Sequence, residues 1–305
     1  MTIQTVVANP SSSQHANADP WTVKRILDWT TQHLREKGSD TPRLDTEILL
    51  AHARNCTRIE LYTRFDDVVS LEERGLMRAL VERRAQAEPV AYLVGHREFF
   101  GLEFLVSSDV LIPRPDTETL VMELLDAIKC RSSARIVDMG TGSGCIAICA
   151  AVHCPDAHVT AIDISPAALK VAMANAQKHA VSDRIAFSNG DLFAPLDNQA
   201  AFDVIVSNPP YVRLDELNQL PRDVGQYEPQ LALVAGADGL DVIRRLVAQA
   251  ADRLVTDGHM LLEIAPEMSE NVRDLLDQTG HFHSARQIND LSGRPRVISA
   301  CRATR

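Results

Sequence analysis

Four consecutive residues, Asn208-Pro209-Pro210-Tyr211, present hydrogen-bond acceptors at the end of the apolar run 202–207. Because proline has no N–H and a fixed φ, this turn leaves backbone carbonyl oxygens free and rigidly aimed. The side-chain oxygen of Asn208 adds a second acceptor, so that two oxygens can converge on one planar –NH2 group. Tyr211 would hold the plane of that group with its ring. The pattern indicates chemistry on an amide or on a ring amino nitrogen.

A glycine-rich loop, Gly140-Thr141-Gly142-Ser143-Gly144, follows an apolar segment and opens a predicted helix. Glycine allows a tight turn and the close approach of a ligand, and the helix N-terminus adds partial positive charge. Asp163 ends the next predicted strand about twenty residues on, where a carboxylate can accept hydrogen bonds from ribose hydroxyls. These residues are therefore predicted to bind an adenosine-containing cofactor.

The spacing and the neighbouring residues favour S-adenosylmethionine over NAD. The third glycine comes one position earlier than in the Gly-x-Gly-x-x-Gly pattern of dinucleotide sites. Asp138 sits just before the loop, where a carboxylate would repel a pyrophosphate but would suit ammonium and sulfonium charges. Asp191 could receive the adenine amino group, and Leu192 could cover the adenine ring. An NAD oxidoreductase would also need an acid/base pair for hydride transfer, and none is evident.

Methyl transfer requires an acceptor nitrogen in line with the sulfonium methyl group. The Asn208 side-chain oxygen and the Pro209 carbonyl can accept hydrogen bonds from both N–H groups of an amide. This would point the nitrogen lone pair at the methyl group and stabilise the positive charge that develops on nitrogen. Asn208, Pro209 and Tyr211 are the predicted catalytic residues, Pro210 joins them in substrate binding, and Asn208 is also expected to touch the cofactor. A glutamine amide and the amino groups of adenine and guanine all remain open as acceptors.

The elements that position these residues alternate between strand and helix, which predicts an α/β fold with a parallel sheet covered on both faces. The predicted strands are 134–140, 158–164, 185–189, 202–208, 259–265, 285–290 and 296–302, and the predicted helices are 116–128, 143–153, 166–179 and 238–255. The long connection after residue 208 has no clear periodicity and is predicted to contact the substrate.

The rest of the chain divides into three further segments. Residues 21–88 have helical periodicity and predict a small bundle of three helices. Residues 89–113, where aromatic residues are punctuated by glycines, predict a β-hairpin linker. Residues 1–20 predict a disordered leader, and residues 114–305 form the predicted Rossmann-like methyltransferase domain.

The composition, with 45% hydrophobic and 24% charged residues in 305, is that of a globular protein. The formal net charge of -10 argues against a large phosphate-binding face and thus against direct sequence-specific binding of nucleic acid. The six cysteines show no zinc spacing, so no metal is predicted. No apolar run reaches the roughly 18 residues of a membrane helix, and residues 1–20 do not form a signal peptide. A cytoplasmic protein without a membrane partner is predicted.

Together these motifs resemble the PrmC/HemK family of protein-(glutamine-N5) methyltransferases over about residues 22–302. The resemblance also includes Pro42-Arg43-Leu44-Asp45, the segments 92–95, 98–101 and 110–118, and Asp290-Leu291-Ser292-Gly293-Arg294. It implies that S-adenosyl-L-methionine methylates the glutamine in the Gly-Gly-Gln motif of class I peptide chain release factors, a step in translation termination. It also implies that the N-terminal bundle helps to recognise the factor.

Carried over by position, the resemblance implies that Gly140 to Gly144 and Asp163 bind the cofactor and that Asn208 to Tyr211 hold the glutamine. Leu192 falls at an adenine contact of the family that is often aromatic. One departure is Ala265-Pro266, where the family usually has glycine.

Several alternatives remain. The glutamine methyltransferase of ribosomal protein uL3 shares the Asn-Pro-Pro-Tyr and glycine-rich segments, but segments 42–45, 113–118 and 290–294 resemble the release-factor enzyme instead. A nucleic-acid adenine or guanine amino-methyltransferase would use the same pocket on a flipped base, but it would normally carry a basic recognition region. A non-catalytic partner of the translation machinery would not need an intact Asn-Pro-Pro-Tyr.

Three charged residues have two interpretations each. Arg114 and Glu118 belong either to a lid near the cofactor or to a solvated helix start. Glu228 either contacts the protein substrate or lies in a surface turn.

Overall fold

The computed structural model describes residues 20–197 and 201–303, which fall into two compact units, one up to Ala85 and one from Gln86 on. The predicted leader, residues 1–20, lies outside the described residues except for Pro20. The first unit contains the helices α1 (Val23–Glu36), α2 (Pro42–Ala53), α3 (Arg58–Thr63) and α4 (Leu71–Arg84). The sequence did not predict α3, because six residues are too few to show a helical period.

The first unit is held by a buried apolar face on α1 and by ionic contacts around α2. Asp45 of α2 is buried, forms an ion pair with Arg84 at 2.7 Å and accepts hydrogen bonds from Ser39 and Thr41. Asp45 belongs to the Pro-Arg-Leu-Asp segment, so this acidic residue ties α2 to α4 within the helical unit.

The predicted hairpin is present but shorter than residues 89–113. Its strands are β1 (His96–Phe99) and β2 (Leu102–Leu105), paired antiparallel. The residues ahead of it form helix α5 (Val90–Val94), which ends at Gly95 with a φ of 81°. An apolar run this short does not distinguish a strand from a helical turn. Phe99 and Phe104 of the hairpin are buried in the core of the second unit.

The described part of the second unit contains a seven-stranded sheet in the order β5-β4-β3-β6-β7-β9-β8. Strands β3 to β7 run parallel, and β9 is antiparallel to β7 and β8. The strands are β3 (Arg135–Met139), β4 (His158–Asp163), β5 (Ile185–Asn189), β6 (Phe202–Ser207), β7 (Leu254–Glu263), β8 (Phe282–Asn289) and β9 (Pro295–Arg302). The predicted Rossmann-like α/β fold class is confirmed.

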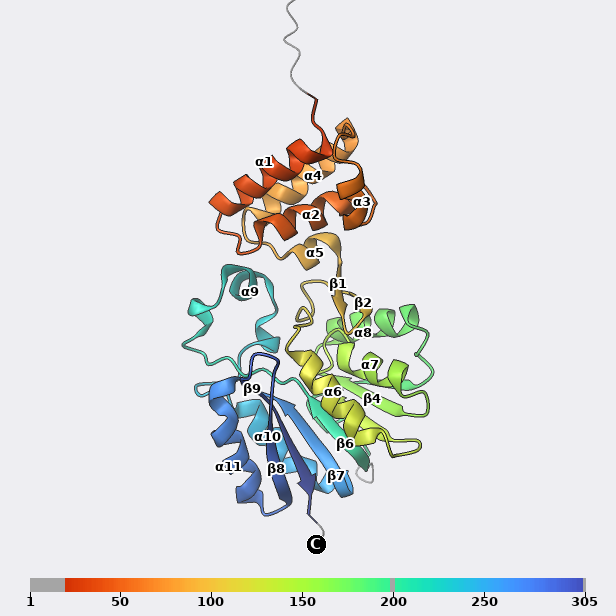
Figure 1. The fold of residues 1–305 in the computed structure, drawn as a ribbon. Helices are drawn as coiled ribbons and strands as arrows, with labels where there is room; N and C mark the ends of the chain where they lie inside the picture. Colours follow the sequence, from red (N-terminus) through yellow and green to blue (C-terminus); the bar gives the residue numbers. More distant parts are fainter. Residues whose placement is uncertain (1–19, 198–200, 304–305) are drawn as a thin grey trace, which may run out of the picture. The chain divides into compact units, whose positions relative to one another are not determined.

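Helices cover both faces of this sheet (Figure 1). On one face, α6 (Thr117–Ile128), α7 (Cys145–His153) and α8 (Pro166–Lys178) contribute to the same core as Ile136 of β3. On the other face, α10 (Asp241–Ala250) and α11 (Ser269–Thr279) pack with Val137 of β3. Consecutive residues of one strand thus point into opposite cores.

In the last third, one helix was missed, the predicted helix 238–255 extends past the end of α10 at Ala250, and one strand begins earlier than predicted. Helix α11 was not predicted, because its buried stripe is sparse, with Val272 and Leu276 as its buried apolar residues. Strand β7 begins at Leu254 instead of 259, because the Asp257-Gly258 pair that looks like a turn is a bulge within the strand, where the register against β6 shifts.

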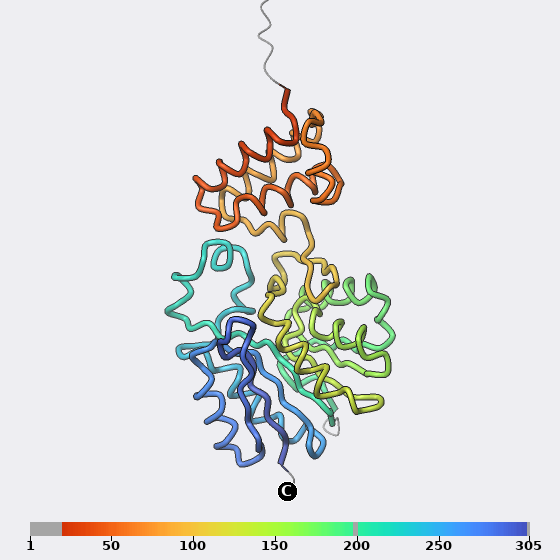
Figure 2. Tube along the Cα trace, viewed as in Figure 1, coloured from red at the N-terminus to blue at the C-terminus, as the bar shows by residue number. Residues whose placement is uncertain are grey.

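The long connection from β6 to α10 leaves the sheet and returns to it through short helices (Figure 2). These are η1 (Leu217–Gln219), α9 (Arg222–Tyr227) and η2 (Gln230–Ala232), while η3 (Ala251–Arg253) and η4 (Pro266–Met268) lie farther on. Among residues 20–197 and 201–303, no helix is long and apolar enough to cross a membrane.

Candidate active site

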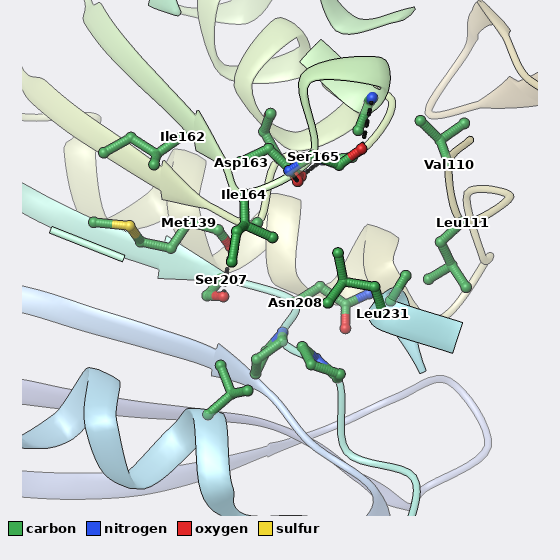
Figure 3. A pocket seen from close by; sticks show the side chains of 18 of the residues that line it. Val110, Leu111, Met139, Ile162, Asp163, Ile164, Ser165, Ser207, Asn208 and Leu231 are labelled. Atoms are coloured by element: carbon green, nitrogen blue, oxygen red, sulfur yellow. Dashed lines mark hydrogen bonds between the residues drawn. The ribbon is translucent and has the colours of Figure 1, made fainter. Parts of the chain in front are cut away.

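The carboxyl ends of β3, β4, β5 and β6 surround a cavity of about 250 Å3. Ligands of open α/β sheets bind at this edge, where the chain connections on the two sides of β3 diverge. Figure 3 shows Asp163 and Ser165 on one side of the cavity and Asn208 with Leu231 on another. The predicted site residues in its wall are Gly140, Thr141, Gly142, Ser143, Asp163, Asp191, Leu192, Asn208, Pro209 and Pro210. Asp138, Gly144 and Tyr211 are not among the described lining residues.

The glycines of the loop after β3 serve two different purposes. Gly142 lines the cavity with a φ of 56°, and its N–H donates to Asp163 at 2.8 Å. Gly144 lies behind the wall, where a Cβ would come within 3.0 Å of the Ile148 Cδ1 and 3.1 Å of the Ala172 Cβ. A side chain at Gly144 would therefore push α7 away from α8.

Asp138 is fully buried behind the same loop. Its Oδ2 accepts hydrogen bonds from the Thr141 hydroxyl at 2.6 Å and from the Ala147 N–H at 3.2 Å. Burial raises the pKa of Asp138 to about 7, and its Oδ1 has no hydrogen-bond partner in the described part of the chain. The Asp138 carboxyl thus holds the loop in place through these two hydrogen bonds. Its attraction for a bound cation stays a prediction.

Asp163 ends β4 and reaches into the cavity (Figure 3). Each carboxylate oxygen accepts one backbone hydrogen bond, Oδ2 from Gly142 and Oδ1 from Ser165, both at 2.8 Å. Because a carboxylate offers about four acceptor positions, each oxygen keeps a further one for a ligand. Burial raises the pKa of Asp163 above its ordinary value, and the two N–H donors oppose this shift.

Asp191 and Leu192 follow β5 and line the cavity. The Asp191 carboxylate accepts from the Arg245 guanidinium of α10 at 2.5 Å, and both side chains are about half exposed. Leu192 has a φ of 50°, a backbone conformation that is uncommon for leucine. A ligand amino group would therefore share Asp191 with Arg245.

Asn208 follows β6 with its side-chain amide at the cavity wall. Its Nδ2 donates to the hydroxyl of Thr117, the first residue of α6, at 3.3 Å. This contact leaves Oδ1 as the free acceptor of the amide. Below it, the Ser207 hydroxyl donates to the Met139 carbonyl at 2.7 Å, which ties the ends of β6 and β3 together. Pro209 is buried beside Asn208.

Tyr211 is not among the described residues that line the cavity. Its ring packs against the core beneath α10 and α11, and burial raises the pKa of its hydroxyl to about 12, with a further contribution from the nearby Glu263 carboxyl. The predicted contact of this ring with an amide plane stays a prediction.

An ion pair attaches the long connection after β6 to the wall of the cavity. Arg114 lies in the wall and donates to Glu228 of the long connection at 2.6 Å. Glu228 is buried, and burial raises its pKa while Arg114 opposes the shift. Pro229 and Leu231 directly after it also line the cavity. Glu228 is therefore neither a substrate-facing residue nor part of a surface turn. Its ion pair with Arg114 instead attaches this connection to the cavity wall.

Glu118 does not lie in the cavity wall. Its Oε1 accepts from the backbone N–H of Phe100 at 3.1 Å, which attaches the hairpin to the start of α6. Of the two interpretations of the helix start, the lid fits Arg114, while Glu118 has this structural contact instead.

Three residues at or beside the site were not predicted to have a role in it. Thr117 and Arg245 line the cavity, and the carboxyl of Glu263 is buried near Thr117, whose hydroxyl lowers its pKa. Thr117 lies in segment 110–118 of the resemblance but was given no role there. Arg245 and Glu263 stand in no spaced motif, because they reach the site from a helix middle and a neighbouring strand.

The lining fits S-adenosylmethionine better than a phosphate-bearing cofactor. The carboxylates of Asp163 and Asp191 suit hydroxyl and amino donors and would repel phosphates. In the wall that the structure describes, both arginines, Arg114 and Arg245, are already paired with carboxylates. A ligand with hydroxyls and net positive charge therefore matches the donor set.

Two family models match the chain. The model described as the PrmC N-terminal domain matches residues 25–95, and the one described as the methyltransferase small domain matches residues 115–220. The release factor glutamine methyltransferase of Rhodopirellula baltica is 45% identical, over 95% of this chain and 100% of that protein. The protein of the same name from Geobacter sulfurreducens is 41% identical, over 91% and 96%.

A solved structure supports the fold. The hMettl16 catalytic domain, in complex with the MAT2A 3'UTR hairpin 6, superimposes with a TM-score of 0.55 at 18% identity, over 73% of this chain and 81% of that chain.

Proposed function

This chain belongs to the family of release factor glutamine methyltransferases, and on that basis we propose that it methylates the glutamine of the Gly-Gly-Gln motif in class I peptide chain release factors. The enzyme is an S-adenosylmethionine-dependent protein-(glutamine-N5) methyltransferase, as the sequence predicted. The free Oδ1 of Asn208 at the cavity wall carries the proposal for how the acceptor amide is held.

Asp163 and the loop from Gly140 to Ser143 would hold the cofactor, with Asp138 and Gly144 supporting the loop from behind. When bound, S-adenosylmethionine supplies an electrophilic methyl group on a sulfonium sulfur. Asp163 retains acceptor positions for the ribose hydroxyls. Leu192 would cover the adenine ring, and the Asp191 carboxylate would accept a hydrogen bond from the adenine amino group.

Asn208 and Pro209 would bind the acceptor. The Asn208 Oδ1 and the Pro209 carbonyl would accept hydrogen bonds from the two N–H groups of the glutamine amide. This leaves the nitrogen lone pair directed at the methyl group. The same oxygens stabilise the positive charge on nitrogen during transfer. Pro210 and Tyr211 keep the turn rigid, and the released proton passes to solvent or to a nearby acceptor.

The helical unit, from α1 to α4, would recognise the release factor away from the reacting glutamine. We also propose the domain division given by the sequence, at residues 21–88, 89–113 and 114–305. A cytoplasmic location, where release factors work, and the absence of direct sequence-specific contacts with nucleic acid complete the proposal. The net charge of -10 supports this last point.

The test incubates the enzyme and S-adenosylmethionine with a release factor, with its Gln→Ala version in Gly-Gly-Gln, and with ribosomal protein uL3. Tandem mass spectrometry should find one added methyl group on the glutamine of the first protein alone. Methylation of uL3 but not of the release factor would refute the proposed substrate.

A further inference from the structure

The orientation of the Asn208 amide depends on its hydrogen bond to Thr117. Its Nδ2 donates to the Thr117 hydroxyl at 3.3 Å, and Thr117 is 2% exposed. A hydroxyl carries a single hydrogen, so Thr117, whose oxygen accepts from Asn208, directs its own hydrogen elsewhere. The carboxyl of Glu263, which is 1% exposed and whose pKa the Thr117 hydroxyl lowers, is the acceptor that we assign to this hydrogen. The assigned order from donor to acceptor is Asn208, Thr117, Glu263.

Glu263 is placed for this by the sheet. Strands β6 and β7 run parallel, with Ser207 opposite Leu262. The next residues along the two strands are Asn208 and Glu263, so the carboxyl lies directly beside the acceptor turn. Its Oε2 has no hydrogen-bond partner in the described part of the chain. A buried carboxyl without full pairing is unfavourable for stability, which points to a role in the site.

We propose that Thr117 and Glu263 are positioning residues, which hold the Asn208 amide with its oxygen towards the glutamine. The inference rests on the proposed function, because it explains how the acceptor oxygen of that reaction is presented. The two ends of an asparagine side chain have the same shape and differ only in hydrogen bonding. Without a fixed hydrogen-bond partner, the Asn208 side-chain amide could flip and exchange the positions of its oxygen and its NH2 group. The NH2 group of Asn208 would then face the NH2 group of the substrate.

The protonation state of Glu263 determines whether the donor-to-acceptor order of the hydrogen bonds from Asn208 through Thr117 can reverse. An ionised carboxylate only accepts, so Thr117 must donate to it and must accept from Asn208. A protonated carboxyl can donate to Thr117, whose hydrogen is then free to bind the Asn208 oxygen and occupy it. Transfer therefore requires the ionised form.

Several charged or titratable groups face Glu263 from the elements packed around it. They are Arg114 and Asp116 before α6, Tyr211 after β6, Cys145 at the start of α7 and Arg296 of β9. Burial raises the pKa of Glu263 to about 7, while Thr117 and Arg296 oppose the shift. Because the ionised form exists above this pKa, methyl transfer should rise as the pH increases through about 7.

The first test separates the hydroxyl of Thr117 from its shape. Thr117→Val should lower kcat on the order of tenfold to hundredfold, the range for misplaced groups, and Thr117→Ser should restore it. The Kd of S-adenosylmethionine, measured by calorimetry, should change by no more than about twofold, since the reacting end alone is disturbed. Thr119→Val is the matched control, because Thr119 is a buried threonine of the same helix turn and should keep full activity.

Full activity of Thr117→Val, or a loss that Thr117→Ser does not restore, would overturn the inference. Failure of the wild-type enzyme to methylate a release factor would instead refute the proposed function. A second measurement, which needs no turnover, keeps the two cases apart.

That measurement follows the side-chain amide of Asn208 by nitrogen-15 NMR, with the signal assigned by its loss in Asn208→Ala. In the wild type the signal should shift as the pH crosses about 7, and in Glu263→Gln it should not. Burial also raises the pKa of Asp138 to about 7, but Asp138 is retained in both proteins, so their difference isolates Glu263. An Asn208 signal with the same pH dependence in both proteins would contradict the inference.

Discussion

Asn208 shows how one side chain can be held at one end and remain available at the other. Its nitrogen is bound to Thr117, and its oxygen stays at the cavity wall. An amide nitrogen is a poor nucleophile, so an acceptor that orients it and stabilises its developing charge should matter more for turnover than for cofactor binding.

Asn208→Ala should lower kcat by about a hundredfold to a thousandfold, as loss of one charge-stabilising contact does. The Kd of S-adenosylmethionine should remain near that of the wild type, because Asp163 and the glycine loop are unchanged. Calorimetry and methyl-transfer kinetics on the same preparation measure both quantities. A large rise in the cofactor Kd with kcat preserved would assign Asn208 to the cofactor instead.

Asp163→Asn should weaken cofactor binding by roughly tenfold to a hundredfold, which corresponds to about 1.5–3 kcal/mol for a hydrogen bond to a charged group. An asparagine oxygen can replace one of the two acceptors that Gly142 and Ser165 use, but its NH2 group opposes the other. Asp191→Asn is the comparison, and its effect should be smaller because Asp191 is half exposed and paired with Arg245. An equal loss of cofactor affinity in both variants would contradict the larger role predicted for Asp163.

The sequence could identify the strand-end residues, since each of them follows an apolar run and has a chemically distinctive side chain. It could not identify Thr117, because the contact with Asn208 joins positions 91 residues apart and depends on where α6 meets the sheet. The same applies to Glu263, whose neighbour on β6 is known only from the strand register.

Among the elements, the connection from β6 to α10 has the most specific role. Sequence periodicity did not predict its short helices, and neither interpretation of Glu228 in the sequence included its ion pair with Arg114. The ion pair of Glu228 with Arg114 brings Pro229 and Leu231 into the cavity wall. Prediction worked best for β3 to β6, where apolar runs are continuous, and failed for α11, whose buried stripe is sparse.

Glu228→Gln should release this connection and speed dissociation of S-adenosylmethionine on the order of tenfold, because loss of a buried charge partner acts mainly on the off-rate. Stopped-flow measurement of cofactor release tests this. Glu216→Gln is the matched control, since Glu216 lies in the same connection, has a side chain that is 42% exposed and pairs with Arg213 at 3.9 Å. An exposed pair of this kind contributes little, so an equal change in both variants would contradict the role of Glu228.

Over the whole molecule, the described chain forms two compact units, and the apolar clusters around the sheet and the hairpin draw only on residues after Gln86. The cofactor cavity is likewise lined by residues of the second unit. The chemistry and the recognition of a large protein substrate are therefore separable in principle.

A chain that begins at Gln86 should keep its affinity for S-adenosylmethionine and its activity on a short peptide containing Gly-Gly-Gln. Its kcat/KM for the intact release factor should fall by at least about tenfold, the loss expected when a second binding surface is removed. Circular dichroism and calorimetry establish that the shortened chain is folded. Equal losses for peptide and factor would argue against a recognition role for the helical unit.

The most direct test of the account is a crystal structure of the enzyme with S-adenosylhomocysteine and a peptide containing Gly-Gly-Gln. We expect the glutamine amide nitrogen at about 3 Å from both the Asn208 Oδ1 and the Pro209 carbonyl oxygen, the ordinary hydrogen-bond distance, with its free side towards the sulfur. A glutamine bound elsewhere, or with its carbonyl oxygen towards Asn208, would contradict the central claim.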